Sequence, residues 1–172
     1  TAIAFFMLTG ELMTSATITD RLVALSRALI GRIRGGLAQV NVLVSMFFAG
    51  MNGSVVADTA TVGALVLPAM KKAGYPAAFS AAVTGVSSTI GGIIPPSIMM
   101  IVLANSTEIS IAALFAAGII PGILIGVVIM IINHYFAIKY NFERSDEPFS
   151  IRRAGKELYR SSFALLIPLV LV

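Results

Sequence analysis

The chain has 172 residues, of which 58% are hydrophobic and only 12% are charged, and its mean hydropathy is +0.95. Soluble domains carry about 25% charged residues, so this composition excludes an ordinary soluble domain and indicates a membrane protein in contact with the lipid bilayer. The net charge of +4 comes from short basic patches between apolar runs, a pattern that sets membrane orientation and does not indicate nucleic-acid binding, and the absence of cysteine excludes disulfides and thiolate metal sites.

The first 36 residues are predicted to hold the end of a membrane helix and then an amphipathic helix at the membrane surface. Residues 1–14 are apolar, and a helix over 20–33 places leucines at helical spacing with arginines mostly on its other faces. Thr19 offers an N-cap for this second helix, and Gly35-Gly36 is predicted to end it. The apolar opening has no basic leader and does not indicate a signal peptide, and the last apolar run, SSFALLIPLVLV, is too short to cross a bilayer. We therefore interpret the chain as part of a larger membrane protein.

Residues 37–70 are 34 residues without lysine or arginine, whereas one membrane span needs about 20 residues and two spans about 40. Basic residues flank this segment on both sides: Arg32, Arg34, Lys71 and Lys72. The positive-inside rule therefore places both of its ends in the cytoplasm. The sequence GMNGS at its middle predicts two half-length helices, the first closed by Gly50 and the second opened by Ser54. Length and charge together predict a re-entrant hairpin that reaches about mid-membrane and returns.

A second interruption is predicted in the next membrane helix. After the turn KKAGYP, in which Pro76 starts a helix, residues 77–90 are apolar and rich in small side chains, and then the chain has GGIIPPS followed by IMMIVLAN. Two glycines followed by two prolines cannot continue a helix. We therefore expect one broken membrane helix, whose first half ends at Gly91 or Gly92 and whose second half starts at the Pro95-Pro96-Ser97 step.

The remainder of the chain is predicted to return through the membrane. The loop STEIS carries Glu108 and no basic residue, which suits the outside, and residues 109–138 form a long apolar segment in which Pro121 predicts a kink. The basic stretch that follows is predicted to be cytoplasmic. The expected organisation is an end of a membrane helix and a surface helix in 1–36, a hairpin and a broken helix in 37–106, a membrane helix in 107–140, and a basic connector with the start of another membrane helix in 141–172.

The two interruptions are expected to lie at similar depth. In hydrocarbon every backbone group must be satisfied, so non-helical backbone is tolerated only against protein or a water-filled cavity. Each break leaves free carbonyls at one helix end, which suit a hard cation, and free N–H groups at the next helix start, which suit an anion. One such break is usually a kink, but two polar breaks favour the cavity-lining site of an ion-coupled secondary transporter.

Several polar side chains accompany these breaks. Asp58 lies about one turn into the second half of the hairpin. Its carboxylate either interacts with the free N–H groups at the start of its own helix or serves as a cation ligand or proton relay. The hydroxyls of Ser88 and Thr89 adjoin the second break, although hydroxyls in membrane helices also bond to the carbonyl one turn back. Three asparagines are predicted to form hydrogen bonds between helices: Asn41, Asn105 and Asn133. The motifs HExxH, GxSxG and the P-loop are absent, so we do not expect an enzyme.

Three separated blocks, GSVVADTATVG, PAMKKAGYP and IIPPSI, are followed by IAALFAAGIIPGILIG. Together they resemble the large membrane subunit of tripartite ATP-independent periplasmic (TRAP) transporters. The resemblance covers residues 4–140 and weakens over 141–172. The sequence departs from the family pattern at Gly92, where we expect proline, and at Asn52, where the family often has serine.

This resemblance implies an all-α polytopic membrane protein with an ion-transporter-like elevator fold, in which a transport domain with two re-entrant hairpins slides against a scaffold. The chain would hold one inverted repeat, made of a hairpin and a broken helix. The implied function is sodium-coupled import of organic acids, such as C4-dicarboxylates or sialic acid, across the bacterial inner membrane. The implied partners are a small membrane subunit and a periplasmic substrate-binding protein, with Na⁺ as the coupling ion and no other cofactor.

With this resemblance we expect one sodium ion to be held by oxygen atoms around Asn52, Gly53, Ser54, Thr89, Gly91 and Pro95. The hydroxyl and N–H groups of Ser54, Ser88 and Ser97 are expected to face the substrate carboxylate, and Asp58 is expected to brace the hairpin tip or relay an ion. The alternatives are another elevator-type dicarboxylate or ion carrier without a binding protein, and a pore or non-transporting membrane scaffold.

Overall fold

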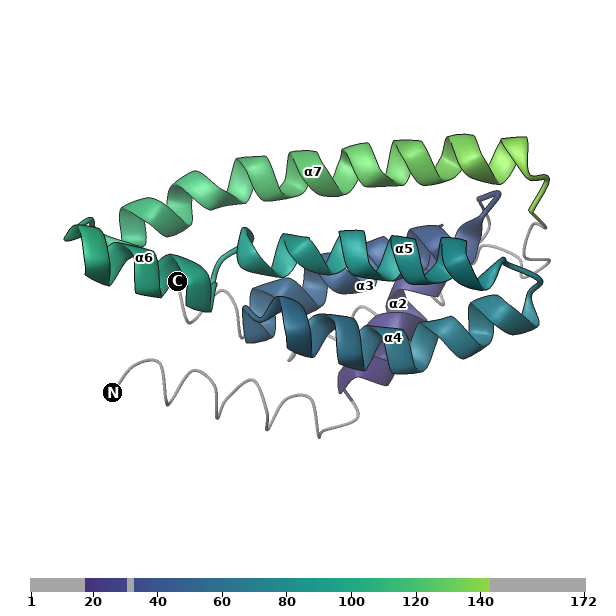
Figure 1. The fold of residues 1–172 in the computed structure, drawn as a ribbon, viewed down its shortest axis with the longest axis horizontal. Helices are drawn as coiled ribbons and strands as arrows, with labels where there is room; N and C mark the ends of the chain where they lie inside the picture. Colours follow the sequence, from purple (N-terminus) through teal and green to yellow (C-terminus); the bar gives the residue numbers. More distant parts are fainter. Residues whose placement is uncertain (1–17, 31–32, 143–172) are drawn as a thin grey trace.

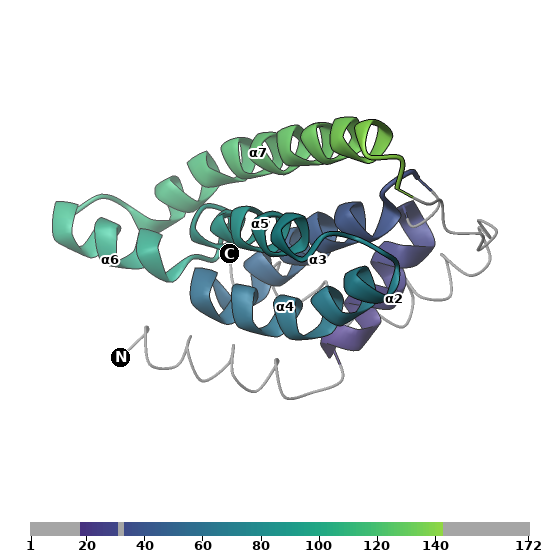
Figure 2. The ribbon, with the colours of Figure 1, turned by 45° about the vertical axis from the view of Figure 1, so that its right-hand side comes forward.

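The computed structural model describes residues 18–30 and 33–142, and every regular element in these ranges is a helix. The elements are α2 (Ile18–Ile30), α3 (Gly36–Asn52), α4 (Val55–Lys72), α5 (Ala77–Ser88), the 3-10 helix η1 (Thr89–Gly92), α6 (Ile98–Thr107) and α7 (Ile111–Lys139). Helices α3, α4 and α5 pack together, α6 extends beyond the end of α5, and α7 lies along one side of the group (Figures 1 and 2). The all-α prediction is confirmed for the described residues.

Helices α3 and α4 form a helical hairpin and run in opposite directions (Figure 1). Gly53 adopts a left-handed conformation with φ of +58°, and its N–H donates to the Ala49 carbonyl at 3.1 Å, which ends α3. The Ser54 hydroxyl then accepts the Ala57 N–H at 3.3 Å and caps α4, as predicted. The predicted end of the first half at Gly50 is wrong, because α3 continues through Gly50 and the chain reverses only at Gly53.

The helix formed by α5 and α6 is broken where the sequence predicts. Helix α5 passes into the single turn η1, and α6 begins after a short loop. Pro95 and Pro96 have no N–H groups, so the helical pattern of hydrogen bonds cannot continue through them. Ser97 joins the two sides of the break, because its hydroxyl donates to the Gly92 carbonyl at 2.9 Å and accepts the Met100 N–H at 3.4 Å.

Helix α7 packs closely against the hairpin and the broken helix through Gly118, Gly122 and Gly126, which are spaced four residues apart. A Cβ atom added at Gly118 would lie 2.6 Å from the Ile93 carbonyl oxygen, and one added at Gly126 would lie 2.5 Å from the Met46 sulfur. The absence of side chains at these positions lets the helices approach, as is common between membrane helices. Pro121 lies inside α7, and the helix continues through it.

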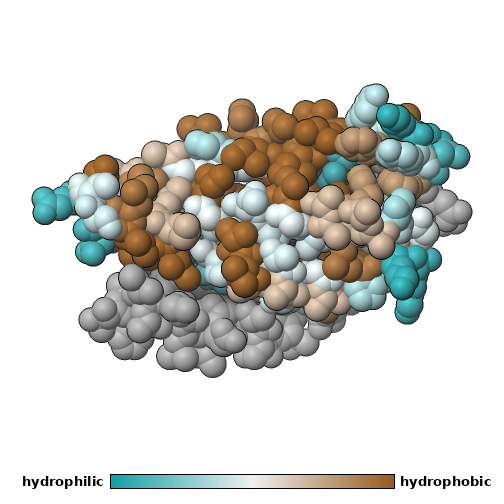
Figure 3. Space-filling view, in the orientation of Figure 1, coloured by the Kyte–Doolittle hydropathy of each residue, from teal (hydrophilic) through white to brown (hydrophobic). Residues whose placement is uncertain are grey.

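The outer face of α7 is apolar and bulky. Its exposed side chains include Ile120, Leu124, Val127, Ile131 and Ile132, and they form the brown band along the upper edge of Figure 3. Within the described residues, α7 is the one helix that is long and apolar enough to cross a membrane, while α3 and α6 are shorter apolar helices. This surface suits contact with lipid.

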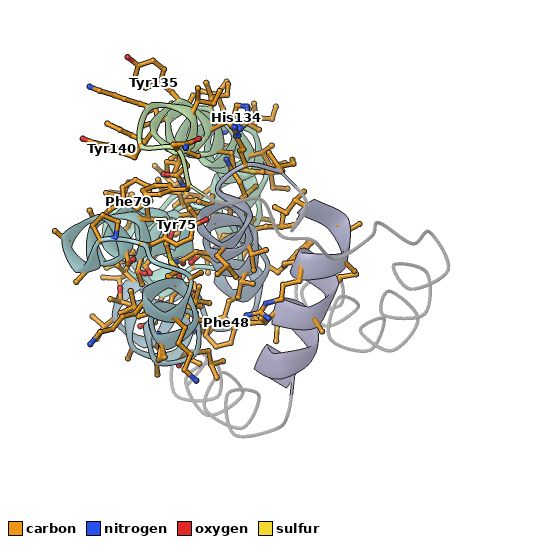
Figure 4. The ribbon with its side chains drawn as sticks, turned by 90° about the vertical axis from the view of Figure 1, so that its right-hand side faces the viewer. Phe48, Tyr75, Phe79, His134, Tyr135 and Tyr140 are labelled. Carbon is orange, nitrogen blue, oxygen red and sulfur yellow. The ribbon has the colours of Figure 1, made fainter. Side chains whose placement is uncertain are left out.

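An aromatic cluster closes the end of the molecule opposite to the hairpin turn. The Tyr75 ring lies 4.5 Å from the Phe142 ring between centroids, and the Phe79 ring lies 5.2 Å from Phe142 and 6.1 Å from Phe136. Figure 4 shows Tyr75 and Phe79 between the hairpin and α7. These contacts hold the KKAGYP turn against the C-terminal end of α7. Lys71, Lys72 and Lys139 end α4 and α7 at this same end of the molecule.

Helix α2 packs across α3, with the side chains of Leu22 and Leu25 fully buried. The part of the predicted apolar face that holds Leu22 and Leu25 is therefore turned toward the hairpin, whereas Leu29 on the same face is 42% exposed. Two predicted boundaries are wrong: α2 begins at Ile18, so Thr19 lies inside the helix, and Gly36 is the first residue of α3. The glycine pair therefore opens the hairpin, because Gly35 adopts a left-handed conformation with φ of +72° immediately before α3. The predictions for 1–17 and 143–172 lie outside the described residues.

Candidate functional site

The two helix interruptions are in direct contact. The Ile98 N–H at the start of α6 donates to the Gly53 carbonyl at 3.3 Å. A Cβ atom added at Gly53 would lie 2.5 Å from the Pro96 carbonyl oxygen, and one added at Gly91 would lie 3.7 Å from the Ser54 carbonyl carbon. The turn of the hairpin therefore rests on the loop of the broken helix (Figures 1 and 2).

The C-terminal ends of the first halves present free carbonyl groups at this contact. The carbonyls of Gly50, Met51 and Asn52 at the end of α3 accept no hydrogen bond from the described residues. The Gly91 carbonyl in η1 also accepts none, because Pro95 stands where the helical N–H donor would be. These oxygens carry the partial negative charge of helix C-termini, and oxygen atoms are the ligands that a hard cation prefers.

The N-terminal ends of the second halves present N–H groups at the same place. In the part of the chain that the structure describes, the N–H groups of Val55 and Val56 at the start of α4 and of Met99 in α6 donate to no acceptor. Helix N-termini favour anions. The hydroxyl oxygens of Ser54 and Ser97 accept N–H groups of their own helices, so they cap the helices beside this position.

Asn52 and Thr89 flank the contact in different ways. The Asn52 side chain is 4% exposed, its amide oxygen accepts the Ser54 N–H at 3.0 Å, and its Nδ2 group has no acceptor among the described residues. Thr89 is exposed, and its hydroxyl donates to the Val86 carbonyl at 2.7 Å. The Thr89 hydroxyl therefore bonds to a carbonyl about one turn back in its own helix, and its oxygen retains lone pairs that are available to a ligand.

Asp58 lies beneath the hairpin turn and is fully buried, and neither of its carboxylate oxygens accepts a hydrogen bond from the described residues. Asp58 therefore does not accept a hydrogen bond from the N–H groups at the start of its own helix. The hydroxyls of Ser45 and Ser88 lie beside the carboxylate, but they donate to the Ser87 hydroxyl at 3.3 Å and to the Thr84 carbonyl at 2.8 Å. The hydroxyl oxygens of Ser45 in α3 and Ser88 in α5 therefore lie close to the carboxylate oxygens of Asp58 in α4.

This arrangement places Ser88 with Asp58, inside the group formed by α3, α4 and α5. Ser45 was not predicted to be a site residue, and its position beside Asp58 was not predicted either. The available signal was the spacing of Asn41, Ser45 and Asn52, which lie four and seven residues apart on one face of α3. A second polar contact on this face was predicted: the Asn41 amide donates to the Thr84 hydroxyl at 2.7 Å and so joins α3 to α5. The corresponding predictions are not confirmed for Asn105, which is exposed, or for Asn133, whose Nδ2 has no described acceptor.

Discontinuous helices that bring both kinds of helix end together are typical of ion-coupled secondary transporters. Residues 1–172 match the family model described as "Tripartite ATP-independent periplasmic transporter, DctM component". The chain therefore belongs to this family of transporter permeases, and the resemblance found in the sequence is confirmed.

Several curated relatives are similar to the chain over most of its length. The chain is 43% identical over 136 residues to the C4-dicarboxylate TRAP transporter large permease protein of Pseudomonas aeruginosa, a match that covers 79% of this chain and 32% of that protein. It is 36% identical over 171 residues to the sialic acid TRAP transporter large permease protein of Vibrio cholerae and 37% identical over 171 residues to the 2,3-diketo-L-gulonate TRAP transporter large permease protein of Escherichia coli. Each of these two matches covers 99% of this chain and 40% of the relative.

The chain thus spans two fifths or less of the length of these three relatives. The names of all three identify transporter permeases, and none identifies an enzyme.

Proposed function

We propose that the chain forms one inverted repeat of a sodium-coupled importer of organic acids in the bacterial inner membrane, fed by a periplasmic binding protein. The observation that carries this proposal is the contact between the two interruptions, where free carbonyl groups and free N–H groups meet. Relatives are named for C4-dicarboxylates, sialic acid, 2,3-diketo-L-gulonate and isethionate. All of these compounds carry an acid group, which matches the N–H groups at the starts of α4 and α6.

The contacts of α7 locate the hairpin turn along the length of this helix. The loop of the broken helix, on which the hairpin turn rests, lies beside Gly118 in α7, and the open end of the hairpin lies where Gly35 meets Ala137. The distance along α7 from Ala137 back to Gly118 is about 28 Å, whereas the whole 29-residue helix is about 43 Å long. A hairpin that starts at the cytoplasmic end of α7 therefore ends well before the other end of this helix.

The proposed sodium site uses oxygen atoms around six residues: Asn52, Gly53, Ser54, Thr89, Gly91 and Pro95. The free carbonyls of Asn52 and Gly91 are its strongest candidates, because no hydrogen bond from the described residues competes for them. The substrate carboxylate is proposed to bind beside Ser54 and Ser97, at the N-termini of α4 and α6. Ser88 is proposed to act with Asp58, since it lies beside that carboxylate.

Asp58 is proposed to belong to the ion path. Its two unpartnered oxygens and the lone pairs of Ser45 and Ser88 form an all-oxygen environment, and ionisable side chains at membrane depth are generally functional. This environment suits either a metal cation or a proton. The same experiment that identifies the coupling ion distinguishes the two.

That experiment is uptake of a labelled acid by the complete transporter, with its small membrane subunit and periplasmic binding protein, while external Na⁺ is varied. We expect saturable uptake that requires both Na⁺ and the binding protein. Uptake that is independent of Na⁺ and driven by a pH gradient would overturn sodium coupling and would identify Asp58 as the candidate proton carrier. Uptake without the binding protein would indicate another elevator-type carrier, and flux without saturation would indicate a pore.

A further inference from the structure

The amide group of Asn52 is held in one orientation. Its oxygen accepts the Ser54 N–H at 3.0 Å, and turning the amide over would place an NH₂ group against that N–H donor. The Nδ2 group therefore cannot exchange places with the oxygen. It is buried and has no acceptor among the described residues. Because a buried donor without a partner costs stability, this position indicates an acceptor that arrives from outside the described residues.

The surroundings of Asn52 identify the charge of that acceptor. An N–H group cannot coordinate a cation, so Nδ2 requires an oxygen atom that carries lone pairs. The free N–H groups of Val55 and Val56 lie three and four residues further along the chain, at the positive end of α4. An acid anion is the ligand that satisfies both the amide and the helix N-terminus.

The main chain of the same residue has the opposite preference. The Asn52 carbonyl lies at the C-terminal end of α3 and accepts no hydrogen bond from the described residues. It therefore offers a cation ligand on the residue whose side chain offers an anion donor.

We propose that Asn52 contacts both transported species, with its Nδ2 group donating to the acid group of the substrate and its main-chain carbonyl coordinating the coupling cation. This inference rests on the proposed function, which it extends by naming one residue that links the two ligands. A bound cation then stabilises the anion beside it, and the anion stabilises the cation by the same factor. Asn52 is thereby a specificity residue for the acid group and a link in the coupling.

The variant Asn52→Asp tests the proposal, because aspartate keeps the size of the side chain and an acceptor for the Ser54 N–H while it replaces the donor with negative charge. In the complete transporter reconstituted in proteoliposomes, we expect the KM for the acid to rise about tenfold or more. The Na⁺ concentration for half-maximal uptake should stay unchanged or fall, because the added charge attracts a cation. The labelled probes are succinate, sialic acid, 2,3-diketo-L-gulonate and isethionate, each used where the wild-type protein transports it.

Two further variants separate binding from folding. Asn133→Asp is the matched control, because Asn133 is also 4% exposed with an unpartnered Nδ2 but lies in α7, away from the hairpin turn; its KM for the acid should remain within about twofold of wild type. Asn52→Ser keeps a hydroxyl donor and should raise the KM less than Asn52→Asp does.

An unchanged acid KM in Asn52→Asp would overturn the proposal, and so would equal defects in Asn52→Ser and Asn52→Asp. A rise in both half-saturation constants together with a lower melting temperature would assign Asn52 a structural role and would also overturn it. Sodium-independent uptake by the wild-type protein would instead refute the sodium coupling of the proposed function, and the role of the Asn52 side chain would still be decided by the acid KM.

Discussion

The two helix interruptions reach a similar chemical result by different means. Both second halves begin with a serine cap, at Ser54 and Ser97, and both first halves end with carbonyls that lack a helical donor. In the hairpin, one left-handed glycine, Gly53, reverses the chain. In the broken helix, Pro95 and Pro96 remove two N–H groups. The hairpin therefore depends on a missing side chain, and the broken helix depends on missing donors, so different substitutions should break them.

The largest effect on stability is expected for Gly53→Ala. The new Cβ atom would meet the Pro96 carbonyl oxygen at 2.5 Å, and the backbone would remain at a φ of +58°. Together these should lower the free energy of unfolding by about 2–5 kcal/mol. Gly74→Ala is the matched control, because φ is +80° there but nothing lies within 4 Å of the new atom; it should cost about 1–2 kcal/mol. Equal losses in detergent-solubilised protein would contradict the contact between the interruptions.

Asp58→Asn should separate function from stability, since within the described residues only the hairpin side of the site contains a buried carboxylate. Removing an unpartnered buried charge should leave the melting temperature unchanged or raise it. Uptake of the labelled acid should nevertheless fall about tenfold or more, because the ion loses a charged ligand. A protein that melts lower but transports normally once folded would show that Asp58 only braces the turn.

The double substitution Pro95→Ala with Pro96→Ala should weaken ion binding at the broken helix. The substitution restores N–H groups at positions from which they can donate to the carbonyls of Gly91 and Gly92. These N–H groups then compete with the cation for the carbonyl oxygens. We expect the Na⁺ concentration for half-maximal uptake to rise about tenfold, as for the loss of one favourable ligand contact. An unchanged sodium dependence would remove the Gly91 carbonyl from the proposed site.

The smallest effect is expected from the two serine caps. Ser54→Ala removes one cap and should cost about 1 kcal/mol of unfolding free energy. Ser97→Ala should cost more, about 2 kcal/mol, because the Ser97 hydroxyl also donates to the Gly92 carbonyl at 2.9 Å. Thermal unfolding of both variants measures the difference, and a larger loss for Ser54→Ala would contradict this assignment.

The interruptions were predictable from the sequence because their causes are local. Serine caps and consecutive prolines act within a few residues. The cap of α4 at Ser54 and the break before α6 are therefore predictable from the neighbouring residues in the sequence. The end of α3 was misplaced by about one turn, because the choice between Gly50 and Gly53 depends on which glycine must pack against Pro96.

The contacts within the candidate site were less predictable. The sequence singles out Asp58 as polar in an apolar chain, but it does not show that Ser45 approaches from α3 or that Ser88 turns toward Asp58. Such contacts join residues up to 43 positions apart and depend on how α3, α4 and α5 pack. The orientation of the Asn52 amide likewise follows from a hydrogen bond, to Ser54, that the sequence alone does not establish.

We propose that the hairpin enters the membrane and returns to the same face, so that both interruptions lie within the bilayer. The chain contains no cysteine, so once any cysteines in the rest of the transporter are replaced by serine, single cysteines at the two ends of the hairpin can be labelled selectively with a membrane-impermeant thiol reagent. In the complete transporter, Arg34→Cys and Lys72→Cys should both react in inside-out vesicles and resist the reagent in right-side-out vesicles. Reaction of the two cysteines from opposite faces would show that the segment crosses the membrane and would contradict the proposed site.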